Sequence, residues 1–374
     1  MQAQQIARRL TLPMADLLDR VAATQSRAMV HAHIQAARLV RGKRPLDFIG
    51  GPATEHEVVV DGPLARVLRY RPPATRAAKA PVKPVVVVAS LINKYYVMDL
   101  LPELSVLDLL RRHGLDLFVL DWKAPGDLGP QLRFEDYVDG AIAQAVEEAA
   151  RAAGTSAVGM IGYCMGGTLA AMYAARHADR VKSLVLLGTP IDFHQTGELS
   201  RVTKREVFDA ELLMDVYGNM PPSLMQSGFK LLHPMEAVWK YLRLHLDGTI
   251  VEDEARARQF VALESWLDDN SAFPGGVYRR YIRDLYQENK LVRGQFTLGG
   301  EIVDLRKIAA SLLNVIALKD HICAPPASRA LMSLVSSTDK RALEFDTGHI
   351  GLTTSRKSHE ALWPEIAAWL EARL

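Results

Sequence analysis

The chain has 374 residues, of which 49% are hydrophobic, enough for one large core with an insertion rather than two equal domains. Its 45 Lys and Arg residues nearly balance 43 Asp and Glu residues, so the chain lacks the excess of positive charge that would indicate a nucleic-acid partner. The only cysteines, Cys164 and Cys323, exclude a disulfide framework and are typical of a reducing, cytoplasmic location. The polar start of the chain predicts neither a signal peptide nor a membrane span.

Residues 1–52 form the first predicted unit, a helical arm. Apolar residues such as Leu17, Leu18, Val21 and Met29 recur at helical spacing, and Gly50-Gly51-Pro52 ends the pattern. The arm carries more apolar residues than a free arm needs. We therefore expect the arm, or the cap beside it, to dock a second subunit or a second copy of the chain; the alternative is that the arm folds back onto its own sheet.

Residues 53–193 and 301–374 form the two parts of a predicted α/β core. Two strands joined by Asp61-Gly62-Pro63 come first, and further strands follow as continuous apolar runs that alternate with helices. Such runs are typical of parallel strands that are covered on both faces. The predicted strands are 55–60, 64–70, 85–88, 117–120, 158–161, 184–187, 312–318 and 342–345, and a helix over 361–374 closes the chain.

The alternation of apolar strands and helices stops over residues 194–300, and this predicts a helical cap inserted into the core. The stretch is rich in methionine and aromatic residues and is broken by prolines, among them Pro221-Pro222 and Pro274. We expect the cap to cover the site and to open for substrate. Its large apolar side chains are expected to pack into a small core of their own; direct contact with substrate is the alternative.

Gly162-Tyr163-Cys164-Met165-Gly166 lies between an apolar run and a helical run, and it predicts a nucleophile elbow with a thiol in place of serine. The flanking glycines leave room for the sharp turn. The start of a helix favours the thiolate form of Cys164. The alternative is a buried core cysteine beside incidental glycines.

Asp320 follows the apolar run 312–318, and His349 lies in the loop after the run 342–345. The order of nucleophile, acid and base is that of the α/β-hydrolase fold, which we predict here as a mostly parallel sheet with helices on both faces. Taken singly, Asp320 could cap a helix and His349 could be structural. Taken together, the three residues favour a catalytic triad.

The chain also resembles a known family, the poly(3-hydroxyalkanoate) synthases, which polymerise hydroxyacyl-coenzyme A thioesters. The resemblance rests on motifs spread from about residue 40 onward: 91–100 (LINKYYVMDL), Asp121-Trp122, Glu135-Asp136-Tyr137, 162–168, 189–193, Asp320-His321 and 348–351. It implies that Cys164 is the acylated nucleophile, His349 the base and Asp320 its partner, with His321 as a supporting residue.

The short segment before the first strand resembles the short type of synthase, which works with a second small subunit. That likeness implies short monomers such as 3-hydroxybutyryl-coenzyme A and a place at the surface of polymer granules. We expect no cofactor, because the coenzyme A thioester is itself the substrate. We also expect no metal, since His321 and Cys323 lack a second pair of ligands at usable spacing.

Attack on a thioester places negative charge on oxygen and needs donors fixed in advance. The N–H of Met165 is the first expected donor, and that of Ile92 or Asn93, in the loop after the 85–88 strand, is the second. Asn93 could instead be a turn residue that satisfies its own backbone. Asp320 either orients His349 or acts on the hydroxyl itself.

Two rival functions share this fold. A cysteine-dependent thioesterase would pass the acyl group to water instead of a hydroxyl. A silent scaffold that coats polymer granules would need no triad, and the complete set of Cys164, Asp320 and His349 argues against it.

Overall fold

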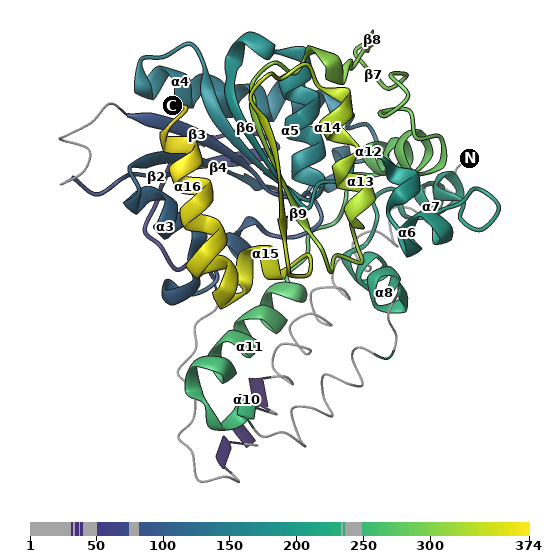
Figure 1. Cartoon of the computed structure of the whole chain (residues 1–374). Helices are drawn as coiled ribbons and strands as arrows, with labels where there is room; N and C mark the ends of the chain where they lie inside the picture. The colour runs from purple at the N-terminus through teal and green to yellow at the C-terminus, as the bar shows by residue number, and fades with distance from the viewer. Residues whose placement is uncertain are drawn as a thin grey trace.

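The computed structural model describes residues 31–32, 34–36, 38–39, 51–74, 82–232, 235 and 249–374. Its centre is an eight-stranded sheet in the order β1-β2-β4-β3-β5-β6-β9-β10 (Figure 1). The first two pairings, β1 with β2 and β2 with β4, are antiparallel, and the others are parallel. The strands are β1 (Glu57–Asp61), β2 (Ala65–Tyr70), β3 (Lys83–Val88), β4 (Leu115–Trp122), β5 (Val158–Tyr163), β6 (Val181–Leu187), β9 (Ser311–Ala317) and β10 (Lys340–Phe345).

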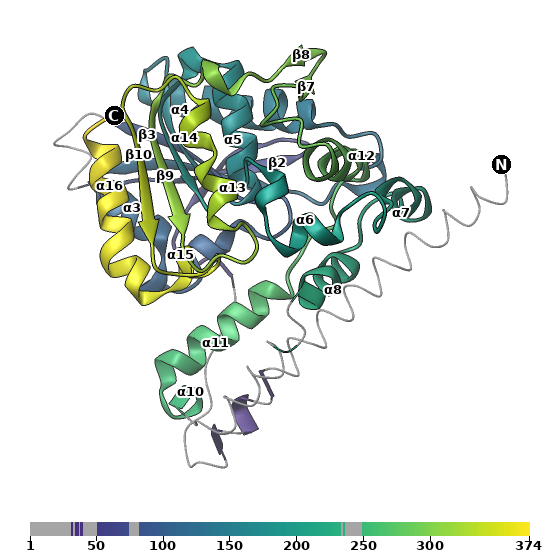
Figure 2. The same cartoon turned by 45° about the vertical axis from the view of Figure 1, so that its right-hand side comes forward.

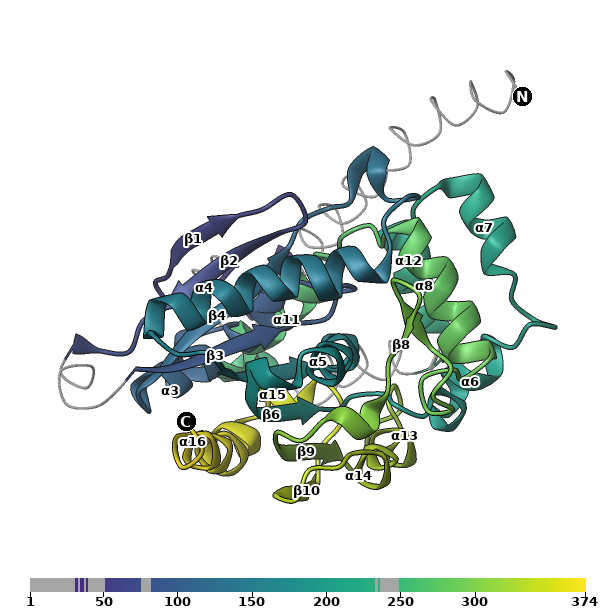
Figure 3. The same cartoon turned by 90° about the horizontal axis from the view of Figure 1, so that it is seen from above.

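Helices cover both faces of the sheet because the central strands are apolar on both sides. Alternate residues of each strand enter opposite clusters: Val86 and Val88 pack with one set of helices, and Val85 and Val87 with the other. The first set is α4 (Ala143–Ala153), α5 (Met165–Arg176) and α14 (Leu331–Leu334), beside α13 (Pro325–Arg329). The second set is α3 (Val106–Arg112) and α16 (Trp363–Glu371) (Figure 3).

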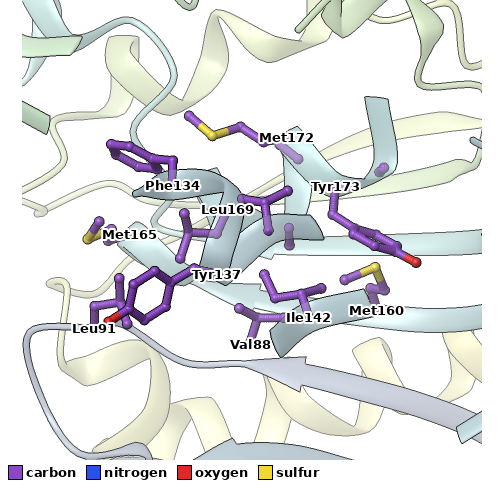
Figure 4. Close-up of a cluster of buried hydrophobic side chains, with 14 of the residues drawn as sticks. Val88, Leu91, Phe134, Tyr137, Ile142, Met160, Met165, Leu169, Met172 and Tyr173 are labelled. Carbon is purple, nitrogen blue, oxygen red and sulfur yellow. The ribbon is translucent and has the colours of Figure 1, made fainter. Parts of the chain in front are cut away.

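The first cluster is centred on α5. Figure 4 shows Leu169 and Met172 of this helix over Val88 of β3 and Met160 of β5, all of them fully buried. The helix contributes an almost continuous run of small and apolar side chains, so it can lie close against the strands. The helix that follows Cys164 is therefore packed in the centre of the molecule.

Helices also fill the described chain between β6 and β9. They are α6 (Glu198–Val202), α7 (Ala210–Tyr217), α8 (Pro222–Leu232), α10 (Thr249–Glu252), α11 (Glu254–Leu267), α12 (Gly275–Arg280) and the π-helix η7 (Tyr281–Gln287). Figure 2 shows α11 below the sheet, beyond the ends of the β9 and β10 arrows and near α15 (Gly351–Thr354). A hairpin of β7 (Thr297–Leu298) and β8 (Glu301–Ile302) spans residue 300, where the sequence predicts the end of the cap.

The predicted α/β-hydrolase architecture is confirmed, and each of the eight predicted strands is present with ends that differ by a few residues. The prediction that the cap packs a core of its own is wrong. Met220, Phe273 and Tyr281 join the cluster that contains α5, and Trp266 joins the cluster on the other face. The reason is that the apolar side chains of this segment pack against those of the core instead of against one another alone.

Most of the predicted arm, 1–52, lies outside the described residues. The positions described between 31 and 39 are helical, and Ile34 packs with Val251, Ala257 and Val261 of α10 and α11. Across the described ranges, none of the helices combines the length and the apolar character that crossing a membrane requires.

Candidate active site

Cys164 occupies the sharp turn between β5 and α5. Its backbone has φ 57° and ψ −130°, a conformation that side chains with a Cβ rarely adopt. The turn is fixed at both ends: the Cys164 N–H donates to the Leu187 carbonyl at 2.9 Å, and the Gly167 N–H donates to the Cys164 carbonyl at 2.9 Å. Cys164 is half-buried, so the turn presents the thiol at the end of the strand.

Glycine at position 166 is required by close packing, as the sequence predicts. A Cβ there would lie 2.2 Å from the Val88 carbonyl oxygen and 2.4 Å from that of Ala89. At position 162 a Cβ would lie 2.5 Å from the Gly167 Cα. Because these neighbours are backbone atoms, they cannot turn aside, and only glycine lets the elbow sit this close to the end of β3.

His349 and Asp320 form a buried pair. His349 Nδ1 lies 2.6 Å from Asp320 Oδ2, and both side chains are more than nine-tenths buried. The other carboxylate oxygen, Asp320 Oδ1, accepts the N–H groups of Ile322 at 2.9 Å and Cys323 at 2.8 Å. With one oxygen held by backbone donors, the carboxylate is fixed in orientation and directs its second oxygen at the imidazole.

Backbone bonds align the two loops that carry this pair. β9 and β10 are parallel, with Ala317 opposite Phe345, and the ladder continues past their ends. The Leu318 N–H donates to the Phe345 carbonyl at 2.9 Å, and the Lys319 N–H to the Thr347 carbonyl at 2.9 Å. The separation of acid and base is therefore set by strand register.

The charge state of His349 depends on the nucleophile. Burial by itself lowers the pKa of the imidazole, but the negative charges of Cys164 and Asp320, together with hydrogen bonds to both side chains, raise it to about 10. The structure therefore brings all three predicted triad residues together. An imidazole that contacts a cysteine side chain and is oriented by a carboxylate is the arrangement that activates a cysteine nucleophile.

Cys323, the second cysteine, differs from Cys164 in its surroundings. It is buried, and burial together with the charges of Asp320 and Cys164 raises the pKa of its thiol well above the usual range. A thiol that keeps its proton is a poor nucleophile. This contrast favours Cys164 as the reactive cysteine.

The candidate oxyanion donors lie on two segments. Met165 is the first residue of α5, where N–H groups have no carbonyl partner within the helix. The Ile92 N–H, in contrast, donates to Ser90 Oγ at 3.1 Å. The Asn93 side chain hydrogen-bonds to the side chain of Asn270, and the two residues also form an isolated antiparallel bridge. Ile92 and Asn93 thus have other partners in this state, whereas Met165 lies in the first turn of α5.

Two residues near His349 were not predicted from the sequence. The Tyr163 ring stacks on the imidazole, with centroids 5.2 Å apart. Gly188, with φ 51°, lies so close that a Cβ there would be 3.2 Å from the Cε1 and Nδ1 atoms of His349. Tyr163 occupies the variable position of the elbow motif, directly before the nucleophile. This position was the only feature of the sequence that could have indicated its role beside His349.

His321, the supporting residue implied by the family resemblance, is exposed, although its neighbour Asp320 is buried. Within the described part of the chain, no three His, Cys, Asp or Glu side chains gather as a metal site would require. The backbone N–H groups of Ile322 and Cys323 hold the carboxylate of Asp320.

Comparisons with known proteins identify the fold and the family of the chain. Residues 83–354 match the family described as alpha/beta hydrolase fold, and residues 50–110 match the N-terminus of poly-beta-hydroxybutyrate polymerase (PhaC). Among solved structures, a soluble variant of monoglyceride lipase from Saccharomyces cerevisiae superposes with a TM-score of 0.52 at 15% identity, covering 87% of this chain and 97% of that chain. At this identity the likeness shows the fold alone.

Two curated relatives are similar over most of their length. The poly(3-hydroxyalkanoate) polymerase subunit PhaC of Haloferax mediterranei is 33% identical over 99% of this chain and 72% of its own. The protein of the same description from Allochromatium vinosum is 35% identical over 82% of this chain and 85% of its own. With a matching fold, a matching N-terminal segment and relatives of this similarity, the chain belongs to the family of poly(3-hydroxyalkanoate) polymerase PhaC subunits, which are enzymes of the α/β-hydrolase fold.

Proposed function

We propose that the chain polymerises (R)-3-hydroxyacyl-coenzyme A, with 3-hydroxybutyryl-coenzyme A as the monomer, through an acyl group bound to Cys164. The observation that carries the proposal is the placement of Cys164 at a strained elbow beside the buried His349–Asp320 pair. The names of the relatives support the reaction class.

In the first half-reaction the Cys164 thiolate attacks the thioester carbonyl. A carbon–sulfur bond to Cys164 forms, and the developing oxyanion is stabilised by the Met165 N–H at the start of α5. The bond from the carbonyl carbon to the coenzyme A sulfur then breaks, and the leaving thiolate takes a proton from the His349 imidazolium. Exchange of one thioester for another keeps the acyl group activated on the enzyme.

Acylation changes His349 from an acid into a base. The charge and the hydrogen bond of Cys164 both raise the pKa of His349, and both are lost when the sulfur carries an acyl group. The pKa of the imidazole therefore falls after the first half-reaction. A neutral imidazole can then accept a proton, as the next step requires.

In the second half-reaction a 3-hydroxyl group attacks the acyl-Cys164 carbonyl while His349 removes its proton. The ester carbon–oxygen bond forms, the carbon–sulfur bond breaks, and the thiolate and imidazolium are restored. Asp320 orients the imidazole throughout, because its carboxylate is fixed by two backbone N–H groups. Each monomer added releases one coenzyme A.

We further propose that the chain works with a second subunit or as a homodimer at the surface of the polymer granule, and without a cofactor. The relatives are described as subunits, which supports an assembly of more than one chain. Figure 2 shows α11 beyond the ends of the β9 and β10 arrows, and we expect this helix to move when a long polymer leaves.

Incubation with 3-hydroxybutyryl-coenzyme A tests the proposal directly. We expect insoluble polyester together with free coenzyme A, and mass spectrometry should find the acyl adduct on Cys164. Free 3-hydroxybutyrate without polymer would identify a thioesterase, and an adduct on Cys323 would contradict the assigned nucleophile. Parallel reactions with candidate small subunits test the partner.

The Cys164→Ser variant separates acyl transfer from hydrolysis. A serine hydroxyl is a weaker nucleophile at neutral pH, and its ester is less activated than a thioester. We therefore expect a folded protein that has lost most polymer formation and retains at most slow hydrolysis. Full polymer yield from the serine variant would refute the role assigned to thioester exchange.

A further inference from the structure

One short segment at the end of α11 holds the loop after β3. Trp266 Nε1 donates to the Lys94 carbonyl at 2.8 Å, and the Tyr96 hydroxyl donates to Asp269 Oδ2 at 2.7 Å. Asn270 completes the contact through its side-chain bond and antiparallel bridge with Asn93. We call these contacts between residues 266–270 and 93–96 the clasp.

The loop on the other side of the clasp adjoins the elbow. The carbonyls of Val88 and Ala89 lie where a Cβ at position 166 would collide with them. The Trp122 Nε1 donates to the Ala89 carbonyl at 2.9 Å and fixes the start of the loop. The start of the loop is therefore fixed by its packing against the elbow. Residues 93–96, further along the loop, are held by the clasp.

The helix that carries the clasp also reaches the base side of the site. Gln259 Nε2 of α11 donates at 2.8 Å to the carbonyl of Thr354, the last residue of α15. Trp266 is buried in the same cluster as Tyr95 of the loop and Leu352 of α15. Thus α11 spans from the loop after β3 to the helix that follows His349 (Figure 2).

We propose that Asp269 and Asn270 are positioning residues, which hold the loop after β3 against the elbow so that the second oxyanion donor can be reached when substrate binds. The proposal rests on the acyl transfer proposed above and deepens it. The Ile92 N–H bonds to Ser90 Oγ in this structure, and in a loop held by the clasp it needs only to exchange that acceptor for the substrate oxyanion. Removal of one oxyanion donor typically costs about 100-fold to 1,000-fold in rate, so a loosened loop should be visible in the kinetics.

The variants Tyr96→Phe and Asn270→Ala each remove one part of the clasp. Asp215→Asn is the matched control, because it weakens a contact of similar length within the cap, Arg279 Nη2 to Asp215 Oδ1 at 2.7 Å, that does not involve the loop. Two reactions of Cys164 are compared in each protein: single-turnover coenzyme A release from 3-hydroxybutyryl-coenzyme A, and alkylation by iodoacetamide.

Alkylation forms a bond from sulfur to a methylene carbon and releases iodide, so no oxyanion develops. We expect the clasp variants to lose about 10-fold to 100-fold in coenzyme A release, part of the cost of a lost donor, while alkylation stays within about twofold of wild type. The control should match wild type in both reactions. A slower release of coenzyme A with unchanged alkylation would indicate that the clasp positions the loop for acylation.

Other outcomes overturn the proposal. If acylation and alkylation both accelerate, the clasp is only a gate. If both fall together with the melting temperature, the contacts are only structural, and if neither changes, the clasp has no role.

Hydrogen exchange of the amides at 91–98 is a readout that does not need activity, and it should be faster in the clasp variants than in the control. A wild-type protein that forms no acyl adduct would contradict the proposed function. Unchanged exchange of the loop amides in the variants would contradict the clasp itself.

Discussion

The Tyr163 hydroxyl donates a 3.2 Å hydrogen bond to the backbone carbonyl of His349, and its ring stacks on the imidazole of the same residue. The residue directly before the nucleophile in the chain thus holds the base in two ways. Tyr163 is the last residue of β5, and Cys164 follows it. The same strand therefore positions both the nucleophile and, through Tyr163, the base.

We predict that Tyr163→Phe keeps most activity and Tyr163→Leu does not. Phenylalanine preserves the stacked ring and loses one hydrogen bond, at a cost of about 1 kcal/mol in the free energy of unfolding. Leucine removes the flat surface on which the imidazole rests, so kcat should fall by about 10-fold, as small displacements of catalytic groups can cost more than this. Steady-state kinetics and urea unfolding check both variants. A leucine variant with wild-type kcat would show that the stack does not position the base.

Gly188→Ala should impair catalysis through His349. Its new Cβ would press on the Cε1 and Nδ1 atoms of the imidazole at 3.2 Å. Gly294→Ala is the control, since Gly294 also has a positive φ, 65°, but faces open space. Both substitutions should destabilise by about 1–2 kcal/mol because alanine disfavours this backbone region. Only Gly188→Ala should also reduce the rate of coenzyme A release, and equal losses in both variants would attribute the effect to the backbone alone.

Cys164→Gly should be more stable than Cys164→Ala. Both variants lack the nucleophile and should release no coenzyme A, but only glycine adopts φ 57° with ψ −130° without strain. A side chain in a sparsely populated backbone region costs on the order of 1–3 kcal/mol, which is the expected difference between the two unfolding free energies. Urea denaturation measures it. Equal stabilities would mean that the elbow stores no strain at Cys164.

The titration of His349 should depend on the state of Cys164. In wild type the imidazole should stay protonated through neutral pH and titrate near pH 10, the value to which its partners raise its pKa. Alkylation of Cys164 or the Cys164→Ala change removes the negative charge that favours the imidazolium, so the pKa must move down. NMR of the His349 ring across pH 5–11 follows the shift. An unchanged midpoint after alkylation would show that the thiolate does not hold the proton on His349.

The sequence predicts the elements of the sheet well because buried parallel strands need continuous apolar runs, such as Val85 to Val88 and Leu312 to Ala317. It also predicts the elbow, since only glycine tolerates the contacts at position 166. These features are encoded within a few neighbouring residues, so a local pattern suffices to find them.

The clasp and the stack on His349 could not be predicted in the same way. Asn93 and Asn270 are distant in the chain, and an asparagine near a turn is equally typical of a residue that bonds its own backbone. Tyr163 reads as one more apolar residue at the end of a strand until the position of His349 is known. Such pairings depend on how loops far apart in sequence are brought together.

β10 is the last strand of the sheet and pairs only with β9 in the described structure. Most of its side chains are exposed, whereas those of β5 are all buried. Edge elements with few buried contacts open at lower free energy than central ones. His349 follows the edge strand, and Cys164 follows a central one. On warming, we therefore expect the loop that carries the base to separate from the thiol before the centre of the sheet opens.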